Sequence, residues 1–167
     1  MIKTENFGTV KEPFPIAVTR YGKVVGETTD GVAVFRGIPY GGRCDRELRF
    51  LPAKEPESWD GVKDCTKNGP ICVQTAGSVS DFYSTGGHPE KLKLRYETQD
   101  ENCLCLNVLT PGLGAKKRPV MVYIHGGGFS ILSGTIMTGA DKLAREQDMV
   151  LVSMNHRLHV FGYLYLG

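Results

Sequence analysis

A run of three glycines directly after an apolar segment is the part of this sequence best suited to chemistry. Residues 120–124 are uncharged and rich in β-branched side chains, and His125, Gly126, Gly127 and Gly128 follow them. This pattern predicts a buried strand that delivers a bare backbone loop to the carboxyl edge of a sheet, where α/β proteins bind ligands. Successive N–H groups without Cβ atoms nearby suit an anion or a developing oxyanion. A tight turn from strand to helix would use the same glycines.

The glycine triplet fits neither of the two common phosphate-binding motifs. A dinucleotide fingerprint needs G-x-G-x-x-G, and Ile131 stands where the third glycine would be if Gly126 were the first. No Gly-Lys-Ser or Gly-Lys-Thr follows, so the loop is not a P-loop. The remaining chemical interpretation is an oxyanion hole, built on an HGGG-type loop after a strand.

Length and composition describe an ordinary globular chain. It has 167 residues, 41% apolar and 23% charged, and its net charge of +2 comes from 20 basic and 18 acidic residues spread along the sequence. We therefore expect no binding to nucleic acid or to a membrane. No stretch approaches the roughly 18 apolar residues of a membrane span, and the N-terminus lacks the apolar core of a signal peptide, so we expect a cytoplasmic protein.

The five cysteines do not predict a disulfide scaffold, and their odd number leaves at least one thiol free. Cys103 and Cys105 form a C-x-C pair on an expected strand, which is not the spacing of a structural zinc site. We expect ordinary buried thiols, and neither a metal ion nor an organic cofactor.

The first third of the chain predicts short strands and irregular structure. Residues 1–15 predict a loose arm because prolines interrupt them. Short β-prone runs at 16–20, 23–28 and 32–38 predict a small antiparallel meander. Residues 43–69 are rich in proline, glycine and charge, and we expect an irregular segment anchored by its single tryptophan, Trp59.

The remainder predicts a central sheet. Between Cys72 and Cys103 we expect a long excursion that is functional or mobile. Three strands and a helix follow, and the strands are expected at 103–109, 119–124 and 149–155. The helix is expected at 141–147, starting from Thr138 or Gly139, with Leu143 and Ala144 facing inward. The last two strands and this helix form a βαβ unit with two parallel strands. The whole predicts an α/β fold: a small antiparallel meander, then a mixed, mostly parallel central sheet.

Six segments stand in an order typical of one family. They are F-R-G-I-P-Y at 35–40, R-F-x-P at 49–52 with W-D-G-V at 59–62, G-P-I-C-x-Q at 69–74, E-N-C-L-x-L-N-V at 101–108 with Thr110 and Pro111, H-G-G-G-F at 125–129, and N-H-R-L-x-V-F-G at 155–162. From about Ile16 to the last residue the chain resembles the type B carboxylesterases of the α/β-hydrolase superfamily, which include the cholinesterases and their bacterial relatives. The resemblance implies a serine esterase acting on small carboxylic esters without a cofactor, and one domain at 16–167.

The resemblance also implies roles for individual residues. Gly127 and Gly128 would donate their backbone N–H groups to the oxyanion of the tetrahedral intermediate. Arg49 and Glu101 would form an ion pair beneath the cysteine-bounded loop. In secreted relatives the two cysteines that match Cys72 and Cys103 are bonded, whereas here we expect them reduced but close together.

The sequence departs from the family pattern at three positions. The family usually has an aspartate where Asn102 stands, an aromatic residue where Cys105 stands, and glycine or another small residue where His159 stands. None of the four histidines is expected to be the catalytic base. His88 lies in the excursion, His125 is expected to orient or pack the glycine loop, and His156 and His159 fall in a segment that is structural in the family.

No G-x-S-x-G nucleophile elbow occurs in the chain. Ser130, Ser133 and Ser153 lack the context of an elbow, so we expect an incomplete α/β-hydrolase domain that ends before the nucleophile and is inactive alone. Strand 119–124 would then be an unpaired apolar edge, and the polypeptide would be poorly soluble. A non-catalytic, cholinesterase-like binding or adhesion protein, or a gene remnant, is the alternative. Substrate specificity and oligomeric state stay open.

Overall fold

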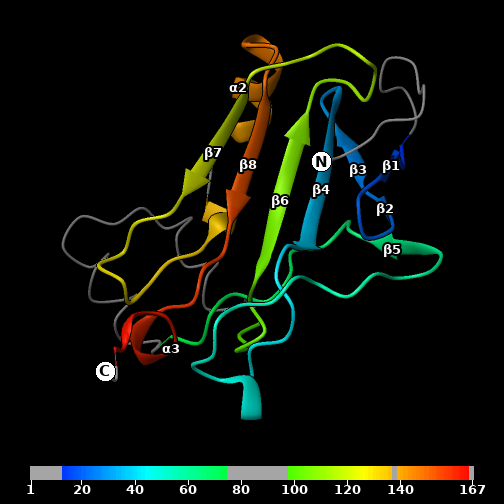
Figure 1. Ribbon diagram of the computed structural model, residues 1–167. Helices are drawn as coiled ribbons and strands as arrows, with labels where there is room; N and C mark the ends of the chain where they lie inside the picture. The colour runs from blue at the N-terminus through cyan, green and yellow to red at the C-terminus, as the bar shows by residue number, and fades with distance from the viewer. Residues whose placement is uncertain (1–12, 75–97, 137–138, 166–167) are drawn as a thin grey trace.

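Two β-sheets and several short helices make up the fold in a computed structural model, which describes residues 13–74, 98–136 and 139–165 (Figure 1). The small sheet has the order β1-β2-β5, and the large sheet has the order β3-β4-β6-β8-β7. The strands are β1 (Ile16–Val18), β2 (Lys23–Val25), β3 (Glu27–Thr29), β4 (Val32–Pro39), β5 (Val62–Asp64), β6 (Cys105–Thr110), β7 (Val120–Ile124) and β8 (Val150–Met154). The helices are η1 (Arg46–Leu48), η3 (Gly134–Ile136), α2 (Ala140–Glu146) and α3 (His159–Tyr163).

The large sheet is mixed, as predicted, but the expectation that it is mostly parallel is wrong for the described residues. Strands β7 and β8 run parallel, while β3–β4, β4–β6 and β6–β8 are antiparallel pairs. The helical crossover through α2 fixes the direction of β8 relative to β7. The long segment before β6 gives no such rule, so hydrophobic patterning located β6 without predicting its direction.

The predicted meander divides at Gly26 into two antiparallel hairpins that belong to different sheets. Strand β1 pairs with β2, and β3 pairs with β4. A Cβ atom at Gly26 would overlap the carbonyl oxygen of Val34. Glycine therefore lets the chain pass from one sheet to the other in direct contact with β4.

Trp59 anchors the irregular segment, as predicted. Its indole N–H donates to the carbonyl oxygen of Lys23 at 2.8 Å, and its ring packs against the apolar core. The same segment also contains β5, which pairs parallel with β2 and was not predicted. Strand β5 has only three residues, two of them charged, and this is too short to show the alternation of apolar and polar residues that predicts a strand.

The N-terminal residues that the structure describes are attached to the hairpins. The carbonyl oxygens of Pro13 and Pro15 accept hydrogen bonds from the amides of Thr28 and Gly26, at 3.1 and 2.9 Å. Most of the predicted arm, residues 1–12, and most of the predicted excursion, residues 75–97 including His88, lie outside the described residues.

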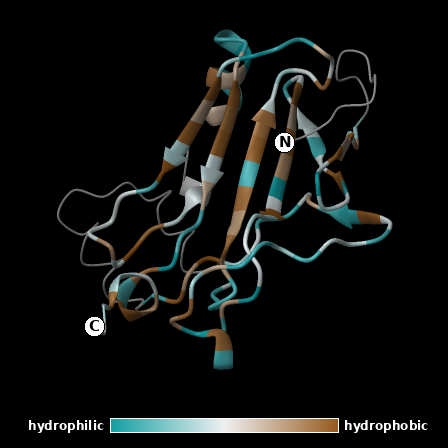
Figure 2. Cartoon of the chain, viewed as in Figure 1, coloured by the Kyte–Doolittle hydropathy of each residue, from teal (hydrophilic) through white to brown (hydrophobic). Residues whose placement is uncertain are grey.

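The core occupies both faces of the large sheet, and apolar residues run along its central strands (Figure 2). Alternate residues of β4 serve the two faces, since side chains of a strand point to opposite sides. Phe35 packs toward the small sheet with Ala17 and Val24. Val32 and Val34 pack with residues of α2 on the other face. Each buried side chain of this size contributes about 1.5–3 kcal/mol.

Helix α2 confirms the predicted crossover helix, with Gly139 as its N-cap in the left-handed region at φ 73°. Ala144 is fully buried, but Leu143 is 37% exposed. The prediction that both face inward was wrong because consecutive residues of a helix are about 100° apart around its axis.

Strand β7 forms one edge of the large sheet and pairs with β8 alone among the described strands. Val120, Val122 and Ile124 are exposed at 62%, 54% and 65%. The predicted apolar edge is therefore present in this structure, and such an edge favours association with other chains.

Candidate active site

The glycine loop lies at the carboxyl end of β7, beside the carboxyl end of β8, where Ile124 pairs with Met154. Three successive residues have positive φ: Gly127 at 116°, Gly128 at 59° and Phe129 at 62°. A bulky residue such as phenylalanine rarely adopts this region, at a cost of roughly 1–3 kcal/mol, and persists there only when its surroundings hold it.

Two anchored carbonyl groups determine the direction of the glycine amides. The Gly126 oxygen accepts a hydrogen bond from His125 Nδ1 at 2.8 Å, so His125 carries its proton on that nitrogen. The Gly127 oxygen accepts from the amides of Ser130 and Ile131, each at 3.1 Å. In a trans peptide the N–H points opposite to the C=O. Holding these two carbonyl groups therefore aims the N–H groups of Gly127 and Gly128.

Neither glycine amide has a hydrogen-bond acceptor within the part of the protein that the structure describes. Unpaired N–H groups are uncommon in folded proteins unless they face water or a ligand. The loop thus presents two adjacent, oriented and unused donors at the carboxyl edge of the sheet.

His125 is packed beneath this loop. It is buried, and its ring stacks on that of His156 with 4.2 Å between centroids. Tyr163 meets the His156 ring edge-on at 6.0 Å. Burial lowers the pKa of His125 below its ordinary value, and the neighbouring His156 lowers it further, while the bond to Gly126 opposes the shift. The imidazole is therefore held neutral, as a donor to the loop.

The depressed pKa of His125 makes the protein less stable in acid. Below the ordinary value of 6.5 the unfolded chain takes up a proton that folded His125 resists. The contribution to stability is thus complete above that pH and is lost as the pH falls toward the folded pKa. Urea titration between about pH 7.5 and 5 gives the unfolding free energies of wild type and of His125→Asn. We expect the difference, wild type minus variant, to become smaller as the pH is lowered. A constant difference would contradict this assignment.

His159 lies in a backbone conformation that suits glycine better than histidine. Its φ is 50°, in the left-handed region, and its amide donates to the Phe129 oxygen at 2.9 Å. Its Nε2 is buried without a hydrogen-bond partner in the described residues. The backbone at this position therefore has a conformation suited to glycine, and the histidine bears the strain.

Replacing His159 with glycine should stabilise the protein by about 0.5–1 kcal/mol. The substitution relieves the left-handed strain and removes an unpaired buried nitrogen, which together exceed the added entropy of the unfolded chain. Urea unfolding measures the effect. His159→Ala, which keeps the Cβ atom, is the matched control, and equal stability of the two variants would contradict the strain argument.

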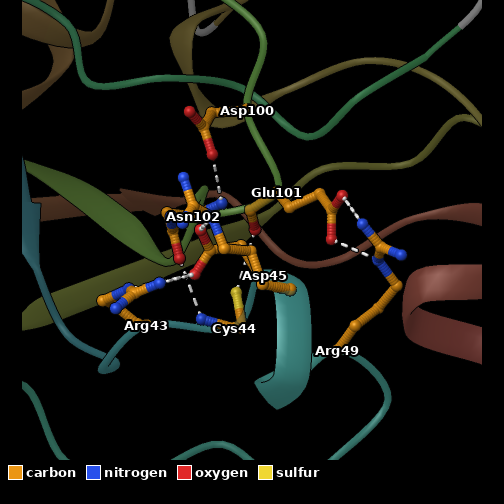
Figure 3. A network of polar contacts seen from close by, with 8 residues as sticks. Arg43, Cys44, Asp45, Arg49, Asp100, Glu101 and Asn102 are labelled. Carbon is orange, nitrogen blue, oxygen red and sulfur yellow. Dashed lines mark hydrogen bonds and ion pairs between the residues drawn. The ribbon is translucent and has the colours of Figure 1, made fainter.

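The predicted ion pair between Arg49 and Glu101 is present and bidentate (Figure 3). Arg49 Nε donates to Glu101 Oε2 at 2.6 Å, and Arg49 Nη2 donates to Oε1. These bonds lower the pKa of Glu101. The adjacent Asn102 accepts from the Cys44 amide through Oδ1 at 2.8 Å, a bond that an aspartate could equally accept.

Cys72 and Cys103 lie in one buried cluster with Leu158, and all five cysteines are free. The Cys72 thiolate is favoured by a hydrogen bond from Cys103, which lowers the Cys72 pKa and raises that of Cys103. Their expected proximity is confirmed. The Cys105 thiol lies against Gly69, where a Cβ atom would be 2.6 Å from the sulfur, so Gly69 has no room for a side chain.

The three serines considered as nucleophiles are engaged elsewhere. Ser130 Oγ donates to the Gly128 oxygen at 3.2 Å, and Ser133 Oγ lies 2.6 Å from Thr135 Oγ1. Ser153 is buried on β8. None of these hydroxyl groups bonds to a histidine among the described residues.

A hollow of about 670 Å³ lies over the sheet face that Phe35 and Val108 share, and the glycine loop does not line it. Its lining combines residues of β4, β6 and β8 with residues of the loops at 19–21 and 112–118. Within the described ranges no group of three or more His, Cys, Asp or Glu is placed to hold a metal ion. No helix in those ranges is long and apolar enough to span a membrane.

The fold and the loop define an α/β protein with a backbone donor site at the edge of its sheet. The sequence matches the profile of the Carboxylesterase family over residues 13–167. It is 38% identical over 153 residues to para-nitrobenzyl esterase of Bacillus subtilis (strain 168), covering 91% of this chain and 29% of the relative. It is 40% identical over 152 residues to phenmedipham hydrolase of Pseudarthrobacter oxydans, covering 90% and 29%.

Solved structures of esterases are also similar to this chain. A thermophilic PNB esterase superposes with a TM-score of 0.77 at 38% identity, over 90% of this chain and 29% of that one. A Geobacillus stearothermophilus carboxylesterase gives 0.74 at 38% identity, over 91% and 28%. This chain belongs to the carboxylesterase family, and the structures it matches are α/β-hydrolase esterases. It spans about three tenths of the length of these relatives.

Sequence reasoning missed two buried amide side chains that support the loop. Gln74 and Asn155 both fall in segments that carried the family resemblance, but neither received a role. The sequence signal was weak, since each residue follows one apolar residue, Val73 or Met154, and precedes a polar one. A buried carboxamide must satisfy its donors and acceptors locally.

Proposed function

We propose that this protein is a carboxylic ester hydrolase in which the Gly127 and Gly128 amides form the oxyanion hole. The observation that carries the proposal is the pair of anchored, adjacent N–H groups that have no acceptor in the described structure. Membership of the carboxylesterase family supports the reaction class.

The reaction would develop negative charge on the substrate's carbonyl oxygen as a serine attacks the carbonyl carbon. The two glycine N–H groups would donate hydrogen bonds to that oxygen. Because their peptide planes are held before substrate arrives, little reorganisation is needed, and one such donor typically contributes about 10²–10³ in kcat. Residues that this chain does not contain would supply the serine and its acid and base partners. We therefore propose that the 167 residues alone are inactive.

A chimera tests this function directly. The part of para-nitrobenzyl esterase of Bacillus subtilis that matches this chain would be replaced by the chain itself, joined to the remainder of that esterase. We expect the chimera to hydrolyse p-nitrophenyl butyrate and the isolated chain to show no turnover. A folded chimera without activity would argue against the proposal and favour a non-catalytic binding protein. Turnover by the isolated chain would contradict the proposal that the serine, acid and base lie outside these 167 residues.

A further inference from the structure

Gln74 is buried, and its carboxamide contacts the chain just beyond the glycine loop. Its Oε1 accepts a hydrogen bond from the Leu132 amide at 2.9 Å. Its Nε2 donates to the carbonyl oxygens of Leu132 and Cys72, each at 3.1 Å. One side chain thus satisfies both backbone groups of Leu132 and ties that residue to Cys72.

Leu132 needs such a partner because its backbone is strained. Its φ is 82°, a conformation that branched L-residues rarely adopt, and it is 8% exposed. A buried amide and carbonyl without partners would also be costly. The two hydrogen bonds between Leu132 and the Gln74 carboxamide therefore compensate for both the strain and the burial.

The effect of Gln74 reaches the oxyanion-hole peptides through Ile131. The Ile131 amide donates to the Gly127 oxygen at 3.1 Å, and that oxygen belongs to the peptide whose N–H is on Gly128. The Ile131 carbonyl oxygen lies so close to Gly127 that a Cβ atom there would overlap it. A shift of Leu132 would move Ile131 and rotate the Gly127–Gly128 peptide.

We propose that Gln74 is a positioning residue for the oxyanion hole, which it holds through Leu132 and Ile131. This inference rests on the proposed function for its catalytic consequence but not for its structural one. Gln74 itself lies too far along this chain of contacts to be a catalytic residue.

Hydrogen–deuterium exchange of the full 167-residue chain at micromolar concentration tests the structural part. Gln74→Met keeps the size of the side chain and removes its hydrogen bonds. We expect exchange at the Ser130 and Ile131 amides, which Gln74 does not contact, to accelerate about tenfold or more, while amides of β4 are unchanged. Gln147→Met, at the exposed C-cap of α2, is the matched control and should leave both amides unchanged.

Unaltered exchange at Ser130 and Ile131 would overturn the proposal, and so would acceleration that is uniform through β4, because Gln74 would then act only on global stability. In the chimera, Gln74→Met should lower kcat about tenfold and change KM little. An equal rise in KM at constant kcat would also overturn it. If the unsubstituted chimera is inactive, the proposed function fails, whereas the exchange result still decides the role of Gln74.

Discussion

Gly127→Ala should lower kcat of the chimera by at least about 10²-fold, the effect of losing one or both oxyanion donors. The new Cβ atom would overlap the Ile131 carbonyl oxygen, which is backbone and cannot move aside as a flexible side chain could. The φ of 116° is also unfavourable for an L-residue. Relieving the overlap or the unfavourable φ would rotate the peptides on both sides of Gly127 and turn their N–H groups away.

Two neighbouring glycines provide graded controls for this substitution. A Cβ atom at Gly126 meets no described atom within 4 Å, and its φ is not in the left-handed region, so Gly126→Ala should retain activity within about threefold. Gly128 has open space but a φ of 59°, and Gly128→Ala should lie between the two variants. Steady-state hydrolysis of p-nitrophenyl butyrate gives all three values. Equal activity of Gly126→Ala and Gly127→Ala would show that the loop is not the oxyanion hole.

Asn155→Leu should destabilise the protein by roughly 2–4 kcal/mol, because the buried Gly134 amide would lose its acceptor and the half-buried Pro70 oxygen would lose its amide donor. Asn155 Oδ1 accepts from the Gly134 amide at 2.8 Å, and Nδ2 donates to the Pro70 oxygen at 3.0 Å. The side chain thereby joins the end of β8 to Gly134 at the start of η3 and to Pro70 in the segment before Ile71. Leucine has a similar volume and no hydrogen-bonding group, so the loss measures the polar contacts.

Urea unfolding of Asn155→Leu should be compared with that of Tyr40→Phe. Tyr40 donates its hydroxyl to the Asn155 carbonyl oxygen at 2.5 Å, so Phe removes one hydrogen bond at the same place and should cost about 1 kcal/mol. Similar unfolding midpoints for the two variants would mean that the Asn155 carboxamide is not the structural link proposed here.

Local patterns predicted most of the elements of this fold. The β-branched run before the glycines became β7, the apolar run at 149–155 contains β8, and the helix between them made their pairing parallel. The direction of β6 and the transfer between sheets at Gly26 were not predictable, because both depend on contacts between residues distant in sequence. A glycine in a strand pattern indicates a bulge or a close approach but not which neighbour approaches.

The candidate site was predicted only as far as the glycines themselves. The types of Gly127 and Gly128 indicated exposed backbone donors, and the structure adds how their peptides are anchored. The positive φ of Phe129 and His159 could not be inferred, since neither residue prefers that conformation. Tertiary contacts impose it, and they include the hydrogen bond between these two residues.

The edge position of β7 has a consequence during synthesis on the ribosome. Val120 pairs with Val150, so the apolar strand is complete before its partner has been made. At about 5–20 residues per second, β7 remains without a partner for roughly 2–6 s in the nascent chain. The intervening segment includes the glycine loop, whose strained residues cannot be held until β8 and α3 arrive. Yield of folded protein should therefore depend on translation speed between β7 and β8.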